Sequence, residues 1–316
     1  MYSIKTIAVL GAGTMGNGIA QISAAAGYTV VMQDIFEESL EKGMAAINKS
    51  LNKMVSKGKM TQETADDTLS KISTTLSLEE AVKDADFVIE AVPEELELKL
   101  ETYKRLNAAC KKDCILGSNT STLPITILAS VVENPERVAG VHFMNPVPVI
   151  KGIELIRARH TSDECMDAIL DYVKRIDREP VMAVDYAGFI VSRILDVYQN
   201  EAVKCVMDGN KPEDIDKAMK LCCNFPLGPC ELMDLVGLDI VEHGLKTLEN
   251  DFGEKYKAAP LLSQMVRAGE VGRKAGKGSI TGSSLPSRKY KRLAILMPLS
   301  ILKISARLRH AVSLPC

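Results

Sequence analysis

Four polar residues accompany apolar runs that we predict to be strands: Ser121, His142, Asn145 and Glu154. If the runs are strands of an open α/β sheet, these residues fall at the carboxyl edge, where such folds bind ligands. Glu154 interrupts the apolar stretch IKGIELI and needs a partner there. A bond to His142 would fix the imidazole tautomer and stabilise its charged form. The pattern predicts proton transfer by His142, although a lone histidine is more often structural than catalytic.

A glycine-rich loop precedes this cluster, within residues 4–34, where an apolar run, a helix-like segment and a second apolar run follow one another. In the spacing G-x-G-x-x-G, the first glycine permits a sharp turn, the second admits a diphosphate and the third lets helix and strand pack closely. Asp34 ends the second run, where a carboxylate binds ribose hydroxyls and repels a phosphate, which favours NAD over NADP. A purely structural glycine turn is the alternative. The predicted cofactor contacts here are Gly11, Gly13, Thr14, Met15, Gly16 and Asp34.

Composition excludes several classes of protein. The chain has 316 residues, 46% of them hydrophobic, and a net charge of −2. Residues 279–316 hold seven basic and no acidic side chains, so the remainder, with 32 basic and 41 acidic, is too acidic for a nucleic-acid protein. No apolar stretch is long enough for a membrane span. Eight scattered cysteines lack metal-ligand spacing, so we expect no metal. The first strand begins almost at Met1 in place of a signal segment, and we expect a cytoplasmic protein.

The elements that position the cluster alternate as strands and helices. Apolar runs predict strands at 86–92, 114–118, 138–143, 152–156 and 180–184, a pattern typical of a Rossmann-type doubly wound parallel sheet. The polar segment after Asp34 predicts a helical hairpin at about 37–75, with Ser50 and Lys57 on its first helix. These two side chains either meet a phosphate-rich ligand or belong to a solvated helix face.

From residue 186 the pattern becomes helical. We therefore predict an NAD-binding domain at 1–185, an all-helical domain at 186–278 and an atypical basic tail at 279–316. The helical domain has a high apolar content for its size, and such a small domain buries its apolar surface best against a partner. We expect a homodimer through this domain.

Several motifs in the same order resemble the L-3-hydroxyacyl-CoA dehydrogenase family, especially its bacterial 3-hydroxybutyryl-CoA dehydrogenases. The resemblance covers about residues 4–278 and rests on GAGTMGNGIAQ, SNTS, HFMNPVP, KGIELI, GFIVSRIL with NEAV, and GPCELMDLVGLD. It implies interconversion of an L-3-hydroxyacyl-CoA and its 3-ketoacyl-CoA with NAD, in fatty-acid and butyrate metabolism.

The resemblance also implies roles for particular residues. His142 would be the general base on the 3-hydroxyl and Glu154 its orienting partner. Ser121 and Asn145 would position the oxygen functions of the substrate and the nicotinamide end of the cofactor. The further implied contacts are Glu94 and Lys99 to the cofactor, and Ser50, Lys57 and Ser121 to the CoA substrate. For Glu94, a carboxylate placed favourably at a helix N-terminus is a competing interpretation.

Two departures from the family pattern stand out. Ser192 occupies the position of the asparagine in G-F-x-x-N-R-[IL], and its single hydroxyl reaches less far than an amide. The chain also lacks the aromatic Phe-Tyr-x-Tyr segment after GRKAGKG, and we interpret its basic tail as an altered terminus. These departures keep two other functions open: a dehydrogenase of a free hydroxy acid or sugar acid, and a catalytically silent dinucleotide-binding protein.

Overall fold

The computed structural model describes residues 2–275 and residue 280, and part of the expected tail at 279–316 therefore lies outside the described residues. The chain divides into two compact units, Met1–Ile194 and a second that begins at Leu195. The expected domain boundary after residue 185 stays a prediction.

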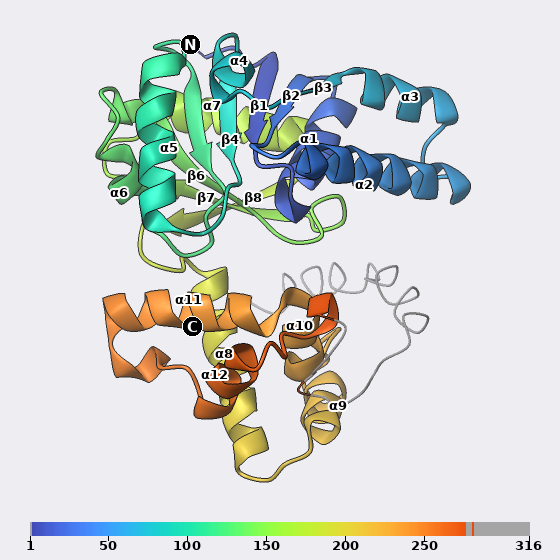
Figure 1. The fold of residues 1–316 in the computed structure, drawn as a ribbon, viewed down its shortest axis with the longest axis vertical. Coiled ribbons are helices and arrows are strands. Elements are labelled where there is room, and N and C mark those ends of the chain that lie inside the picture. The colour runs from blue at the N-terminus through green and yellow to red at the C-terminus, as the bar shows by residue number, and fades with distance from the viewer. Residues whose placement is uncertain (1, 276–279, 281–316) are drawn as a thin grey trace, which may run out of the picture. The chain divides into compact units, whose positions relative to one another are not determined.

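The first unit is built on one eight-stranded sheet with the strand order β3-β2-β1-β4-β5-β6-β7-β8 (Figure 1). Neighbouring strands from β3 to β6 are parallel, whereas β7 is antiparallel to β6 and β8 is parallel to β7. The strands are β1 Thr6–Leu10, β2 Thr29–Gln33, β3 Ile72–Thr75, β4 Phe87–Glu90, β5 Ile115–Ser118, β6 Val138–Phe143, β7 Gly152–Arg157 and β8 Glu179–Val184.

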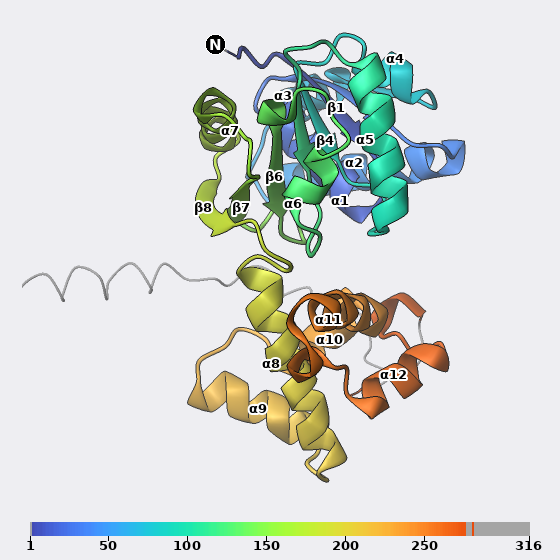
Figure 2. The same ribbon diagram turned by 90° about the vertical axis from the view of Figure 1, so that its left-hand side faces the viewer.

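Helices cover both faces of this sheet, because alternate residues of the central strands point to opposite sides. Ile7 and Val9 of β1 belong to one buried cluster, which includes side chains of α1 and α7, and Ala8 and Leu10 belong to another, which includes Tyr103 of α5. Figure 2 shows α5 and α7 on opposite sides of the strands. The helices are α1 Thr14–Ala25, α2 Glu37–Ser56, α3 Gln62–Ser70, α4 Leu78–Val82, α5 Leu96–Ala109, α6 Ile125–Ala129, η1 Pro135–Arg137 and α7 Asp163–Arg175.

The predicted fold class is confirmed, and two details were wrong. The segment assigned wholly to a helical hairpin also contains β3, an edge strand in which only Ile72 is buried, and the short helix α4 follows it. The sheet is not wholly parallel. The connection between β6 and β7, Met144 to Lys151, is too short for the crossover of a dozen or more residues that a parallel pair requires, so β7 runs back beside β6.

In the second unit the described residues form helices around a core of their own, which includes Val203, Met233, Leu245 and Leu262. The helix α10, Pro229–Val236, ends at Gly237, whose φ of 114° interrupts the helical backbone before α11, Leu238–Phe252, begins. The helices are α8 Val191–Met207, which begins in the first unit, α9 Pro212–Cys222, α10 Pro229–Val236, α11 Leu238–Phe252, η2 Glu254–Tyr256, α12 Pro260–Arg267 and η3 Arg273–Ala275.

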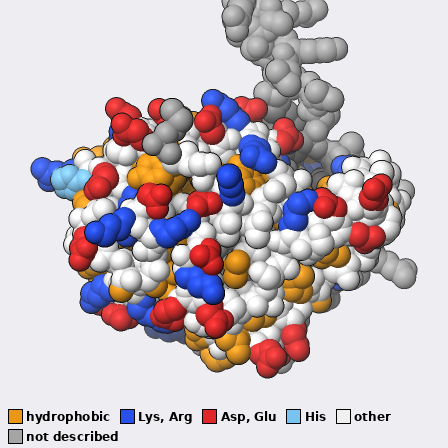
Figure 3. Space-filling model, turned by 90° about the horizontal axis from the view of Figure 1, so that it is seen from above, with side chains coloured by type: hydrophobic (Ala, Val, Ile, Leu, Met, Phe, Trp, Pro, Cys, Tyr) orange, Lys and Arg blue, Asp and Glu red, His pale blue; other side chains and the backbone are white. Residues whose placement is uncertain are grey.

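Charged side chains of both signs are interspersed on the face drawn in Figure 3. Within the described part of the chain, no helix is long and apolar enough to cross a membrane. The same residues contain no group of three or more His, Cys, Asp or Glu side chains that could hold a metal ion.

Candidate active site

His142 and Glu154 form a buried pair on two neighbouring strands. His142 is the fifth residue of β6 and lies directly opposite Glu154 of β7 in the antiparallel register, so the two side chains share a face of the sheet. His142 Nδ1 and Glu154 Oε2 are 2.7 Å apart, and the side chains are 6% and 1% exposed. The hydrogen bond expected from the sequence is therefore present.

The second carboxylate oxygen of Glu154 binds backbone. The amides of Ile190 and Val191, at the start of α8, each donate to Oε1 at 3.0 Å. Burial alone would raise the pKa of Glu154, but the bond to His142, the two amide bonds and the nearby imidazole charge lower it overall. The carboxylate stays ionised near neutral pH, so His142 donates its Nδ1 proton to it and keeps Nε2 as the basic nitrogen.

The other predicted residues of this cluster lie on loops and helix starts around the same sheet edge. Ser121 is half-buried in the loop after β5, and Asn145 is exposed, two residues after β6 ends. Ser192 is half-buried in the first turn of α8, directly after the amide of Val191 that binds Glu154. Glu154 reaches this edge because β7 is antiparallel and begins where β6 ends.

The glycine-rich loop joins β1 to α1 at this edge. Gly11 has a φ of 95°, and a Cβ there would lie 2.5 Å from the carbonyl oxygen of Ala91 in the loop after β4. A Cβ on Gly16 would lie 1.7 Å from the carbonyl oxygen of Gly11, whereas one on Gly13 would meet no heavy atom within 4 Å. Gly13 is the N-cap of α1 and provides no side-chain cap, and the first turn contains no acid. The open helix N-terminus fits the diphosphate of NAD.

Asp34 lies immediately after β2 and is held beside the loop. The amide of Ala12 donates to Oδ2 at 2.9 Å and that of Phe36 to Oδ1 at 3.1 Å. A half-buried carboxylate anchored there fits the ribose hydroxyls of NAD and disfavours the extra phosphate of NADP. Of the two other predicted loop contacts, Thr14 is exposed and Met15 packs partly against the core. Their contact with the cofactor stays a prediction.

Glu94 and Lys99 belong to a network that the sequence did not predict. Lys99 is only 1% exposed and pairs with Glu90 at 2.6 Å and with Glu94 at 3.3 Å. Glu90 is completely buried at the end of β4. The one available signal was an acid inside the otherwise apolar run FVIEAV. Direct contact of Glu94 and Lys99 with the cofactor stays a prediction.

Ser50 and Lys57 lie on a different element, at the far part of α2. Ser50 is half-buried, and Lys57 is exposed at the C-cap of the helix. They are seven positions apart, which is about two helical turns and places both on one face. That arrangement suits a long phosphorylated ligand, and the predicted contact with CoA is untested.

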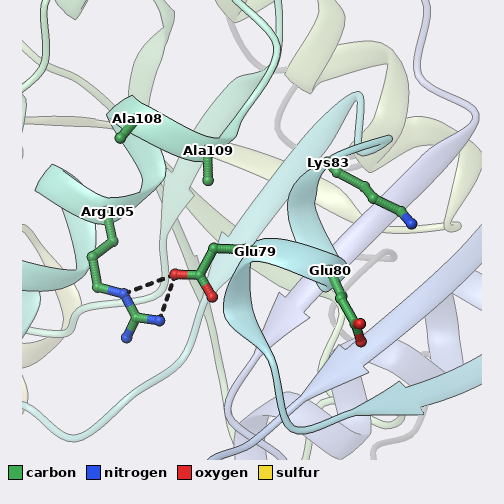
Figure 4. Close-up of a pocket in the computed structure, with 6 residues that line it drawn as sticks. All are labelled: Glu79, Glu80, Lys83, Arg105, Ala108 and Ala109. Carbon is green, nitrogen blue, oxygen red and sulfur yellow. Dashed lines mark hydrogen bonds and ion pairs between the residues drawn. The ribbon is translucent and has the colours of Figure 1, made fainter.

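A surface cavity of about 470 Å³ lies elsewhere on the first unit, between α4 and α5 (Figure 4). Arg105 donates to Glu79 Oε1 at 2.7 Å beside this cavity. The cavity contacts the last turns of α5, a helix of 14 residues and thus about 21 Å long that starts at the carboxyl edge of the sheet. It is therefore separate from the His142 pair. Its lining residues are Glu79, Glu80, Lys83, Arg105, Ala108 and Ala109.

Comparisons with known proteins agree with this geometry. Residues 6–186 match the family model described as 3-hydroxyacyl-CoA dehydrogenase, NAD binding domain, and residues 188–282 match the one described as 3-hydroxyacyl-CoA dehydrogenase, C-terminal domain. The chain is 43% identical over 277 residues to a probable 3-hydroxybutyryl-CoA dehydrogenase of Bacillus subtilis, covering 87% of this chain and 96% of that protein.

Two further similar proteins carry related names. A 3-hydroxybutyryl-CoA dehydrogenase of Clostridioides difficile is 43% identical, over 85% of this chain and 96% of its own length. The crystal structure of (S)-3-hydroxybutyryl-CoA dehydrogenase from Ralstonia eutropha superposes with a TM-score of 0.82 at 41% identity, over 87% of this chain and 98% of that chain. The chain belongs to the 3-hydroxyacyl-CoA dehydrogenase family and is an NAD-dependent oxidoreductase.

Proposed function

We propose that this dehydrogenase acts on short-chain substrates and interconverts L-3-hydroxybutyryl-CoA and acetoacetyl-CoA, in butyrate and fatty-acid metabolism. The observation that most directly supports this reaction is the buried His142–Glu154 pair, which lies at the carboxyl edge of a sheet whose glycine loop fits NAD. The preference for a short chain is supported by the names of relatives about 43% identical to this chain.

His142 removes the proton of the substrate 3-hydroxyl through Nε2. Glu154 accepts the hydrogen bond from Nδ1, holds the ring in place and stabilises the imidazolium that forms. NAD held by the glycine loop and Asp34 would supply the acceptor for the hydride from C3 of the substrate. In the reverse direction the protonated His142 returns its proton to the 3-keto oxygen.

The remaining polar residues position the ligands in this proposal. Ser121, Asn145 and Ser192 hold the oxygen functions of the substrate and the nicotinamide end of the cofactor. Lys57 is exposed at the end of α2 and provides a positive charge for the phosphates of CoA, with Ser50 as a neutral neighbour.

Substrate competition tests the function. We expect kcat/KM for acetoacetyl-CoA, with NADH as reductant, to exceed that for 3-ketodecanoyl-CoA and for free acetoacetate. A preference for the ten-carbon substrate would overturn the short-chain proposal, and turnover of free acetoacetate alone would favour a hydroxy-acid dehydrogenase. Turnover of none of the three would leave a catalytically silent dinucleotide-binding protein.

A charge reversal tests the proposed CoA contact. Lys57→Glu is expected to raise KM for acetoacetyl-CoA without changing the affinity for NADH. Lys59→Glu is the matched control, because Lys59 is also exposed and lies just beyond the same turn. Equal KM values for the two variants would contradict the assignment.

We also propose a homodimer formed through the helical unit. Several large apolar side chains of its described residues are exposed: Met207, Leu221, Phe225, Leu235 and Ile240. Light scattering at micromolar concentration should give twice the chain mass of 34.4 kDa. A mass of a single chain under these conditions would count against the dimer.

A further inference from the structure

Glu90 is a buried acid that the proposed mechanism does not use. It is the last residue of β4, a strand with every residue buried, and it is 0% exposed. A carboxylate in such surroundings is costly unless it is paired and fully hydrogen-bonded. Its partners therefore indicate what the charge is retained for.

Lys99 of α5 is the charged partner, and its ammonium group has no spare donor. Three acceptors surround Nζ: Glu90 Oε1 at 2.6 Å, Glu94 Oε2 at 3.3 Å and the carbonyl oxygen of Val92 at 3.3 Å. An ammonium has three N–H donors, so each has a protein partner. Burial would lower the pKa of Lys99, but the two carboxylates raise it above its usual value. The lysine is held inside the protein as a cation.

The remaining carboxylate oxygens of this triad, Glu90–Lys99–Glu94, hold the loop that follows β5. Ser118 Oγ donates to Glu90 Oε2 at 2.7 Å, at the start of the loop. Glu94 Oε1 accepts from Thr120 Oγ1, Ser121 N, Thr122 N and Thr122 Oγ1 at 2.5 to 3.1 Å. Burial would raise the pKa of Glu94, but Lys99 and these donors lower it. One charged cluster thus fixes both ends of the loop.

The same loop binds backbone on either side of the His142–Glu154 pair, in β6 and in the segment before α8. The amide of Phe143, next to His142, donates to Asn119 Oδ1 at 2.9 Å. On the other side, the amide of Gly188 donates to the carbonyl oxygen of Thr122 at 3.0 Å, two residues before the first amide that binds Glu154. The loop therefore connects the triad to the backbone on either side of the pair.

We propose that Glu90, Lys99 and Glu94 are positioning residues, which hold the loop Asn119–Thr122 and thereby set the placement of Ser121 and of the His142–Glu154 pair. Only the expected effect on kcat rests on the proposed function, whereas the expected effect on the loop does not. Lys99 acts in it through Glu90 and Glu94, since its three donors are used within the protein.

Two variants test the proposal by charge balance. Lys99→Met leaves two carboxylates without their cation. Glu90→Gln combined with Lys99→Met restores the net charge of −1 that the triad has in the wild type. We expect amide hydrogen exchange at Ser121 and Thr122 to be at least 10-fold faster in the single variant and to return most of the way to the wild-type rate in the double variant. This readout does not require turnover, so it remains informative if the proposed function is wrong.

The kinetic readout uses acetoacetyl-CoA and NADH. Lys99→Met should lower kcat by about 10- to 100-fold, the range expected for a site displaced by an ångström or less. Arg137→Met is the matched control, because Arg137 is a buried cation at the opposite end of β6 that binds the carbonyls of Lys111 and Cys114. The melting temperature of this control should fall, whereas its kcat should stay close to that of the wild type.

Equal losses of kcat in Lys99→Met and Arg137→Met, or a double variant no better than the single one, would overturn the proposal. If Lys99→Met does not fold, Thr122→Val replaces it, because this change removes one bond to Glu94 without exposing a buried charge. Its loop amides should exchange faster and its kcat should fall several-fold. Wild-type values for both would refute the positioning role.

Discussion

In the proposed mechanism, Glu154 determines which nitrogen of His142 is free to act as the base. Its carboxylate binds Nδ1 on one oxygen and two backbone amides on the other, so neither partner can rotate freely. A glutamine in its place retains the shape but presents an uncharged amide, which neither stabilises the imidazolium nor fixes the tautomer equally well.

Glu154→Gln is expected to lower kcat and to destabilise the fold in a pH-dependent way. Because the folded-state pKa of Glu154 lies below its usual value, the carboxylate stabilises the protein above the unfolded-state pKa of about 4.3. This contribution is lost as the pH falls through the folded-state pKa. We expect a loss of about 1–3 kcal/mol in unfolding free energy at pH 7, measured with urea, and a smaller loss near pH 3. A difference that does not change with pH would contradict the assignment.

Ser192 is a single-residue departure from the family pattern, because it stands where the motif has an asparagine. It directly follows Val191 in the chain, and the amide of Val191 donates to Glu154 Oε1. Ser192→Asn should restore a longer amide donor and raise kcat for acetoacetyl-CoA reduction by up to about 100-fold, the effect of one well-placed donor. Ser192→Ala serves as the control and should not exceed the wild type. An unchanged or lower kcat in the asparagine variant would refute this role.

At the scale of elements, the turn between β1 and α1 contains closely packed glycines and one glycine that borders open space, which we propose binds the diphosphate. Gly16 packs so closely on Gly11 that no side chain fits, whereas Gly13 borders open space at the helix N-terminus. With a φ of −64°, Gly13 also has a backbone conformation that other residues adopt freely.

Two alanine substitutions test this division. Gly13→Ala should leave the melting temperature within a few degrees of the wild type but weaken NADH binding, because its methyl group occupies the approach to the first amides of α1. Gly16→Ala should lower the melting temperature sharply, because its Cβ would overlap the carbonyl of Gly11. Fluorescence titration with NADH and thermal unfolding give the two readouts. A Gly13→Ala variant with unchanged NADH affinity would contradict the diphosphate assignment.

The sequence predicted those strands that are nearly continuous apolar runs and the loop whose glycine spacing indicates a tight turn. The strands near His142 and the glycine loop were found, because apolar runs and glycine spacing report local structure directly. The edge strand β3 was missed, because only Ile72 of its four residues is buried and the others carry no apolar pattern. The antiparallel direction of β7 follows from the short connection at Met144–Lys151, a constraint on chain length and not on composition.

Side-chain pairing was only partly predictable. The bond between His142 and Glu154 could be expected because adjacent strands bring opposite residues together. The triad of Glu90, Lys99 and Glu94 could not, because its members come from a strand, a loop and a helix whose packing the sequence alone does not define. Lys99 looks like an ordinary surface lysine of a helix, and its burial is apparent only in the structure.

At the scale of the whole molecule, the first unit contains both the predicted cofactor loop and the His142–Glu154 pair. The second unit has its own core, in which Asn200 accepts the amide of Ala259 and donates to the carbonyl of Lys257. We therefore assign the chemistry to the first unit and the proposed dimer contact to the helical unit.

The role of His142 as general base is tested most simply by the rate of NADH oxidation with acetoacetyl-CoA, for the wild type and for His142→Ala. Removing a general acid–base group typically costs about 100- to 10,000-fold in rate, so we expect a loss of this size in kcat. NADH binding, measured by fluorescence, should be retained, because the glycine loop and Asp34 are unchanged. Turnover at the wild-type rate in His142→Ala would contradict the assignment of this histidine as the proton acceptor.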